Sequence, residues 1–86
     1  MGLDETSARI IRAVKAEAAR RGVTGKALAG ALGRDKKYVY ERFRFEKPFA
    51  TSDLEPIASR LGITAATLFA SAALEEQVQA PEVAAA

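Results

Sequence analysis

Apolar side chains recur along this 86-residue chain at intervals of three and four, the spacing that gives a helix one buried stripe. The members of the first stripe lie four residues apart: Ile10, Val14 and Ala18. Acidic and hydroxyl side chains precede this stripe, and two arginines and a glycine follow it, an order that suits the two ends of a helix. The pattern therefore predicts a helix over about residues 5–21, with Asp4 or Thr6 as its N-cap.

Two shorter helices are predicted next, with only a glycine turn between them. Thr24 is a good N-cap for a helix with two inward-pointing leucines, and Gly33 ends that helix. Asp35 can cap a further helix at once, over residues 36–44. The side of that helix predicted to be buried contains Val39 and Phe43.

The C-terminal half predicts two more helices. After a loop over Phe45–Ala50, we expect Thr51 or Ser52 to cap the fourth helix and a glycine to end it. Thr64 then caps a fifth helix, expected to run to about Gln79. Their inward-facing residues are predicted to be Leu54, Ile57, Ala58 and Leu61, then Leu68, Phe69 and Ala72.

No stretch alternates apolar and polar residues over enough positions to form a strand. The predicted fold class is therefore all-α, a compact five-helix domain over residues 1–79 with one core. The remaining segment, 80–86, contains a proline that stops any preceding helix and has little to bury. We expect it to be a disordered alanine-rich tail or the start of a linker.

The second and third predicted helices together suggest a function. Two short helices joined by a tight, glycine-containing turn form a helix-turn-helix. In DNA-binding versions the second helix lies in the major groove, which is about 12 Å wide and accepts one helix. Such a helix needs one apolar face and one hydrogen-bonding face. Residues 36–44 meet that demand, because lysines, a tyrosine, a glutamate and an arginine accompany the buried pair.

The charge distribution fits a polyanionic partner. The net charge of +2 hides an asymmetry, because residues 1–48 carry twelve Lys and Arg against six Asp and Glu. Residues 49–86 carry only Arg60 against five acidic residues. Positive potential is thus concentrated at one end of the molecule, which suits nucleic acid or an anionic membrane. A solvated basic face without a partner is the alternative.

Composition argues against several other classes. The chain has no cysteine and no histidine, so we expect no metal site and no cofactor. General acid-base catalysis would fall to carboxylates or lysine, and no paired carboxylates or glycine-rich phosphate loop suggest an enzyme. No apolar run approaches a membrane span, and the N-terminus does not resemble a signal peptide. We therefore expect a cytoplasmic protein, with no membrane partner and no evident small-molecule ligand.

An ordered series of motifs resembles the phage-repressor helix-turn-helix family, also described as Cro-like or xenobiotic-response-element type. The first motif is Val-Thr-Gly-Lys-Ala-Leu-Ala-Gly-Ala-Leu-Gly at 23–33, the next is Val39, and the last is Leu-Glu-Pro-Ile-Ala-Ser-Arg-Leu-Gly-Ile-Thr at 54–64. The resemblance covers about residues 8–72. It implies a lambda-repressor-like fold and sequence-specific binding of double-stranded DNA. Members are usually bacterial or phage transcriptional regulators, and we expect this protein to be a repressor. Its expected location is the cytoplasm, where it would be associated with the nucleoid, or the cytoplasm of the host if a phage encodes it.

The resemblance also assigns contacts. The residues expected to face base edges are Lys36, Lys37, Tyr40 and Glu41. Those expected to contact phosphates are Thr24, Lys26, Tyr38, Arg44 and Lys47, where Tyr38 is included because its hydroxyl is expected to reach out from a partly buried ring. Glu41 has an alternative role, pairing with Lys37 or Arg44 at helical spacing. Family members usually bind as dimers, so we expect a homodimer, formed in solution or only on DNA, with the fifth helix as a candidate contact.

Two positions depart from the family pattern. The family often has glutamine at the position of Gly25, and it usually closes its third helix with a glutamate-glycine pair where this chain has Phe43-Arg44-Phe45. The loop that follows is therefore expected to sit differently. The main alternative function is a protein-interaction module of the same fold, antitoxin-like or an adaptor, in which the acidic end at Glu75 and Glu76 is a candidate surface. Membrane-surface and RNA-binding roles fit the pattern less well.

Overall fold

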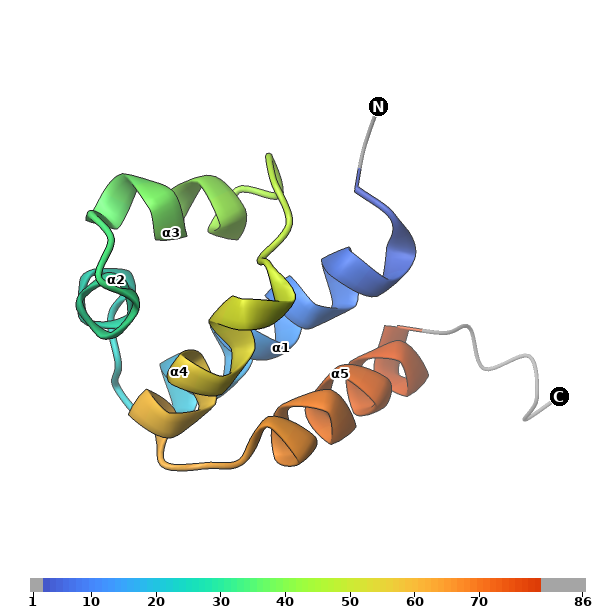
Figure 1. Cartoon of the computed structure of the whole chain (residues 1–86). Helices are drawn as coiled ribbons and strands as arrows, with labels where there is room; N and C mark the ends of the chain where they lie inside the picture. Colours follow the sequence, from blue (N-terminus) through green and yellow to red (C-terminus); the bar gives the residue numbers. More distant parts are fainter. Residues whose placement is uncertain (1–2, 80–86) are drawn as a thin grey trace, which may run out of the picture.

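The computed structural model describes residues 3–79, which form five helices joined by short connections (Figure 1). Their bounds are α1 Glu5–Arg20, α2 Gly25–Leu32, α3 Lys36–Phe43, α4 Thr51–Leu61 and α5 Ala65–Gln79. No strand occurs in this part of the chain, so the all-α prediction is confirmed. The segment 80–86, predicted to be a tail or linker, lies outside the described residues. In Figure 1, α2 and α3 lie at one side of the domain and α5 at the other.

Short polar side chains begin most of the helices where the sequence predicts. The Asp4 carboxylate accepts the Ser7 N–H at 3.1 Å, and Thr24 Oγ1 accepts the Ala27 N–H at 3.0 Å. Asp35 and Thr64 serve α3 and α5 in the same way. Three helices end at a left-handed glycine, at positions 22, 33 and 62, where a side chain would be strained.

The start of α4 differs from the prediction. Its N-cap is Ala50, which has no side-chain acceptor, and Thr51 is already helical. The third helical residue compensates, because the Asp53 carboxylate reaches back and accepts the Ala50 N–H at 3.0 Å. The prediction that Thr51 or Ser52 caps this helix is therefore wrong by one or two residues.

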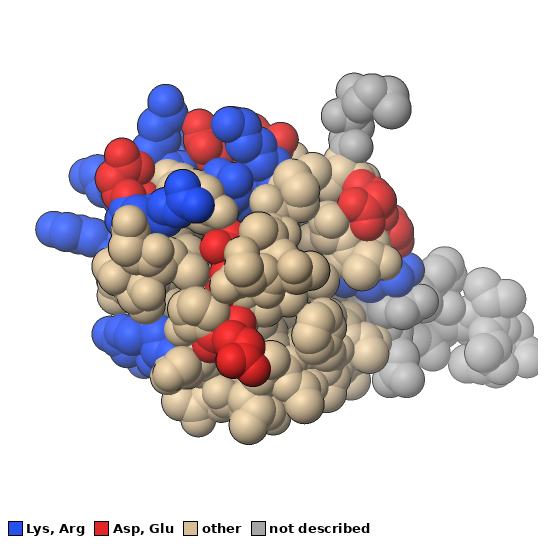
Figure 2. All heavy atoms as spheres, viewed as in Figure 1, with Lys and Arg blue, Asp and Glu red and all other residues tan. Residues whose placement is uncertain are grey.

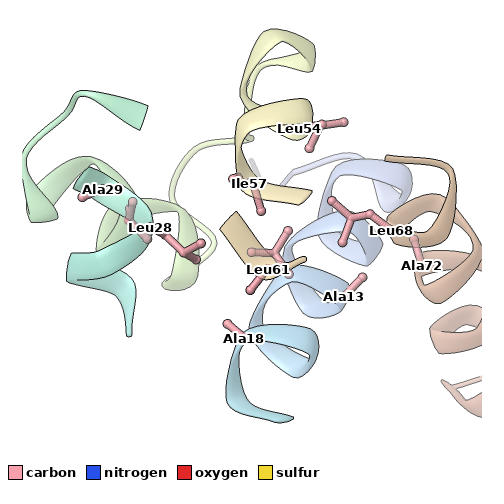
Figure 3. Packing of buried hydrophobic residues seen from close by; sticks show 11 residues of the cluster. Ala13, Ala18, Leu28, Ala29, Leu54, Ile57, Leu61, Leu68 and Ala72 are labelled. Atoms are coloured by element: carbon pink, nitrogen blue, oxygen red, sulfur yellow. The ribbon is translucent and has the colours of Figure 1, made fainter. Parts of the chain in front are cut away.

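One core joins all five helices. Leu28 of α2, Val39 of α3 and Ile57 of α4 are fully buried, and Leu68 of α5 is 2% exposed. Figure 3 shows leucines and alanines from α1, α2, α4 and α5 converging in this core. Because α3 contributes only Val39 to the fully buried set, other contacts must fix its orientation.

The fifth helix packs against α1 through one face only. Leu68 and Ala72 are buried as predicted, whereas Phe69 is 50% exposed, so its predicted place in the core is wrong. A buried carboxylate, Glu17, ties the two helices together by accepting the Ser71 hydroxyl at 2.7 Å. That hydrogen bond, with help from two neighbouring arginines, lowers the pKa of Glu17 against the opposing effect of burial.

Candidate nucleic-acid interface

The turn between α2 and α3 sets the angle of the helix-turn-helix. Gly33 takes the left-handed conformation with φ 68°, and the Arg34 N–H donates to the Ala29 carbonyl at 2.9 Å. Asp35 then caps α3 immediately, with its carboxylate 3.3 Å from the Tyr38 N–H. The chain therefore reverses within a few residues, and α3 crosses the end of α2 as in Figure 1.

The side of α3 opposite its exposed face is fixed to α4 through Tyr38. Its hydroxyl donates to Asp53 Oδ2 at 2.6 Å, and Asp53 is 7% exposed. This hydrogen bond, with burial, raises the pKa of Tyr38. The guanidinium groups of Arg42 and Arg34 cover the ring, at 3.6 and 4.5 Å from its centroid.

This arrangement argues against Tyr38 as a phosphate contact. Its hydroxyl is directed at α4 and already donates to Asp53, so it has no proton left for a phosphate. Sequence reasoning missed Asp53, whose one carboxylate serves the loop, α3 and α4 together. The only signal for it was an acidic residue in the first turn of a helix.

Two lysines at the start of α3 lie open to solvent. Lys36 is exposed and makes no hydrogen bond or ion pair with the described residues. The Lys37 side chain is 78% exposed and lies 3.9 Å from Glu41, the outer limit of an ion pair. Figure 2 shows Lys and Arg gathered over the region of α2 and α3, whereas the lower part of the molecule is mostly uncharged in this view. These side chains are therefore available to an outside partner.

Glu41 lies within a group of cations instead of facing out alone. Its carboxylate is 3.3 Å from Arg42, 3.8 Å from Lys47 and 3.9 Å from Lys37, and only 16% of its side chain is exposed. A carboxylate so placed neutralises its own neighbours. The geometry favours the ion-pair role over the predicted contact with a base.

The predicted phosphate contacts are mostly exposed. Lys26 is exposed beside the Thr24 cap, and it has no ion pair with the described residues. The Lys47 side chain is 58% exposed. The Arg44 side chain is 57% exposed, but its Nε donates to Glu46 at 2.8 Å, so a phosphate would have to compete with that carboxylate. All of these residues lie on or beside the helix-turn-helix.

Tyr40 does not project freely from α3. Its ring lies across the first residue of α2, Gly25, so closely that a β-carbon placed on that glycine would be 2.7 Å from Cζ. The ring also meets Phe43 edge to face, with centroids 6.0 Å apart. Tyr40 is nevertheless 37% exposed. It thus stays available to a partner while being held in one place.

The end of α3 uses an aromatic residue where glycine is usual. Phe45 has φ 63°, and its N–H donates to the Arg42 carbonyl at 2.8 Å while the Glu46 N–H donates to Glu41 at 3.0 Å. This pair of bonds is a Schellman motif with a strained residue at its left-handed position. Lys15 of α1 braces it, with its ammonium 5.2 Å from the ring centroid and 3.2 Å from the Phe43 carbonyl. Sequence reasoning did not assign this role to Lys15.

Among residues 3–79 no group of three or more His, Cys, Asp or Glu side chains gathers as metal ligands would. No single described helix is long and apolar enough to cross a membrane, and only the bent pair of α4 and the first part of α5, at 98° to each other, passes on length and composition.

Comparison with known proteins places this geometry among transcription regulators. No protein-family model matches the sequence, and no curated protein sequence matches it. The clp gene regulator ClgR from Corynebacterium glutamicum matches in structure with a TM-score of 0.77 and 25% identity, covering 92% of this chain and 83% of that one. A second structure of ClgR matches with a TM-score of 0.72 and 26% identity, covering 85% of this chain and 94% of that one. The hypothetical transcription factor NHTF from Neisseria matches with a TM-score of 0.65 and 27% identity, covering 80% of this chain and 82% of that one. The chain therefore has the all-α helix-turn-helix fold of such regulators.

Proposed function

We propose that this protein binds specific double-stranded DNA sequences as a transcription regulator, with α3 in the major groove. The observation that carries the proposal is the two-sided construction of α3. Val39 and the Tyr38–Asp53 hydrogen bond hold one side on the domain, and Lys36 and Lys37 stand exposed on the other. A helix that enters a groove needs such a rigid back and a polar front.

The geometry refines the predicted contacts. We keep Lys36, Lys37 and Tyr40 for base edges, because all three are exposed, the lysines in the first turn of α3 and Tyr40 in its middle. Glu41 is assigned to its ion pairs and Tyr38 to its bond with Asp53. The phosphate contacts are then Thr24, Lys26, Arg44 and Lys47.

The biological setting is a further part of the proposal. The likeness to ClgR, named as a clp gene regulator, and to NHTF, named as a hypothetical transcription factor, supports a bacterial or phage regulator of the Cro-like type acting in the cytoplasm. Repression is the mode we propose, because occupancy of a promoter by DNA binding alone is enough to block transcription. A promoter-reporter assay in which the protein lowers expression from its selected site tests this mode.

Selection from a random duplex library, followed by affinity measurement on the enriched sequence, tests DNA binding directly. Replacing Lys36 and Lys37 together by alanine should weaken binding by at least tenfold, since good base contacts contribute about 1–3 kcal/mol each. The matched control is Arg60→Ala, which removes an exposed cation from α4 and should leave affinity nearly unchanged. Wild-type affinity in the double lysine variant would refute the assignment of α3.

Salt dependence separates this function from a protein-interaction module. The logarithm of the DNA association constant should fall linearly with the logarithm of salt concentration, and each lost lysine-phosphate contact should reduce the slope by about 0.9. Lys47→Ala should show that reduction. A complex formed through apolar helix faces should hardly respond to salt, and that outcome would favour the alternative function.

The outer face of α5 supports a homodimer. Five exposed residues of this face are apolar, namely Ala66, Phe69, Ala70, Ala73 and Leu74, and the exposed, polar Thr67 lies on the same side as Leu74. Large residues at 69 and 74 flank small ones at 70 and 73, and both pairs are symmetric about a point between 71 and 72. In an antiparallel pair of α5 helices crossing there, Phe69 of one copy would face Leu74 of the other. A two-fold interface requires this kind of self-complementary pattern.

Analytical ultracentrifugation with and without the selected duplex tests the dimer and shows whether it forms only on DNA. Phe69→Glu should prevent pairing while leaving the monomer folded, because half of that side chain is already in solvent. Ser59→Glu, an equal charge change on an exposed position of α4, is the control. Pairing that survives Phe69→Glu would place the interface elsewhere.

A further inference from the structure

The backbone conformation at Gly25 does not require a glycine. Unlike Gly22, Gly33 and Gly62, it does not have a positive φ, so an L-residue with a side chain could adopt its conformation. Glycine at a helical position usually destabilises the helix relative to alanine. What stands in the way of a side chain is the Tyr40 ring, with Cζ, Cε1 and Oη at 2.7, 2.9 and 3.0 Å from the place of a β-carbon.

The obstructing atoms are the far end of a side chain that can rotate. The three atoms nearest to the place of a β-carbon at position 25 all belong to Tyr40, so Tyr40 is the residue that a methyl group there would meet first. The methyl group would displace the ring and hydroxyl of Tyr40 from their present position. The structural cost of the change is therefore small, whereas the displacement of Tyr40 is certain at such distances.

Tyr40 is 37% exposed and has a hydroxyl that the described part of the protein does not use. The hydroxyl makes no hydrogen bond with any described residue, although the ring is held by Gly25 on one side and Phe43 on another. By contrast, the hydroxyl of Tyr38 in the same helix is committed to Asp53. Two tyrosines two residues apart thus have opposite roles, one structural and one available.

We infer that Gly25 is a specificity-determining position, although it lies outside the recognition helix. Its missing side chain lets Tyr40 lie across the start of α2, and from there the Tyr40 hydroxyl meets the DNA beside the lysines of α3. This inference rests on the proposed function. It assigns the sequence preference to a pair of residues on two helices, in which Tyr40 makes the contact and Gly25 positions it.

The test compares Gly25→Ala with Gly30→Ala. Gly30 lies in the same helix, and a β-carbon there would meet nothing within 4 Å, so this control makes the same chemical change without touching Tyr40. Gly30→Ala should melt at or slightly above the wild-type temperature. Gly25→Ala should stay folded with a melting temperature close to that of the wild type, because the lost Tyr40 contact offsets the gain in helix propensity. Gly25→Ala should lose about tenfold in affinity for the selected duplex, as should Tyr40→Phe, which corresponds to about 1.4 kcal/mol. Library selection with Gly25→Ala should change the preferred base at one position of the site.

A double variant tests the coupling. In a Tyr40→Ala background, Gly25→Ala should have no further effect on affinity or on the selected sequence, because the ring that it displaces is gone. In the free protein, the α-protons of Gly25 should shift in the NMR spectrum on Tyr40→Ala, since they lie beneath the ring.

The outcomes separate the two proposals. If the wild-type protein enriches no sequence, the proposed function itself fails. If the wild type enriches a sequence and Gly25→Ala binds it as tightly as Gly30→Ala does, with the same base preferences, the inference about Gly25 is overturned and DNA binding stands.

Discussion

The hydrogen bond from Tyr38 to Asp53 should be the polar contact on which the orientation of α3 most depends. Tyr38→Phe removes only the hydroxyl and keeps the ring between Arg34 and Arg42. The bond is short, at 2.6 Å, and its acceptor is buried. Hydrogen bonds to charged groups contribute about 1.5–3 kcal/mol each.

We expect a loss near the lower part of that range, about 2 kcal/mol, because the Asp53 carboxylate keeps a second donor. That donor is the Ala50 N–H at 3.0 Å, so Asp53 is not left without a partner. For a domain of this size, a loss of about 2 kcal/mol lowers the melting temperature by about 8–16 °C.

Tyr40→Phe provides the matched control for urea denaturation followed by circular dichroism. It makes the same change in the same helix, but its hydroxyl has no partner in the described structure, so its effect should stay within about 0.5 kcal/mol. The raised pKa of Tyr38 adds a second readout. The protonated form is favoured in the folded state, so this contribution is complete below the ordinary pKa of 10.0 and is lost as pH rises above it. Equal stabilities of the two phenylalanine variants would refute this account of α3.

Three further predictions concern the core and its supports. Leu28→Ala, at a fully buried position, should lower the free energy of unfolding measured in urea by about 2–5 kcal/mol. Leu74→Ala, at a 58% exposed position, should lower it far less. Similar losses in the two variants would contradict the burial pattern. The lowered pKa of Glu17 means that its stabilisation is complete above the ordinary value of 4.5 and is lost as pH falls through the lower folded value, so Ser71→Ala should reduce the acid dependence of stability. An unchanged acid transition in that variant would argue against the Ser71 hydrogen bond as the main cause. Phe45→Gly should be more stable than Phe45→Ala by about 1 kcal/mol in the same assay, because only glycine adopts a positive φ without strain; the reverse order would contradict the left-handed conformation.

The fold could be predicted largely from local signals. Helix ends depend on a side chain and a backbone N–H three residues apart, so Asp4, Thr24 and Asp35 were readable as caps. The start of α4 was misplaced because Asp53 caps it from inside the helix. Phe69 was misplaced because α5 has apolar residues on both faces, so periodicity does not show which face is buried.

The candidate site was harder to predict, since its decisive contacts join residues on different helices. The exposure of Lys36 and Lys37 follows from helical periodicity. The partner of Tyr38 lies 15 residues further along the chain, and Gly25 lies 15 residues before Tyr40. A pattern within one helix contains no information about such pairs. Glu41 was ambiguous for a related reason, because Lys47, one of its cations, comes from the loop.

The two tyrosines of α3 explain how a helix of eight residues can be both rigid and selective. A short helix with one fully buried side chain would rock about that contact, and any displacement of its exposed lysines would blur a preference among bases. Tyr38 opposes this motion from α4 and Tyr40 from α2, so α3 is held on both sides of Val39. The supports differ in one respect, because Tyr40 remains partly exposed and can itself contact DNA. Loss of the Tyr38 support should therefore weaken binding to all sequences through lower stability of the domain. Loss of the Tyr40 support should instead change which sequence is preferred.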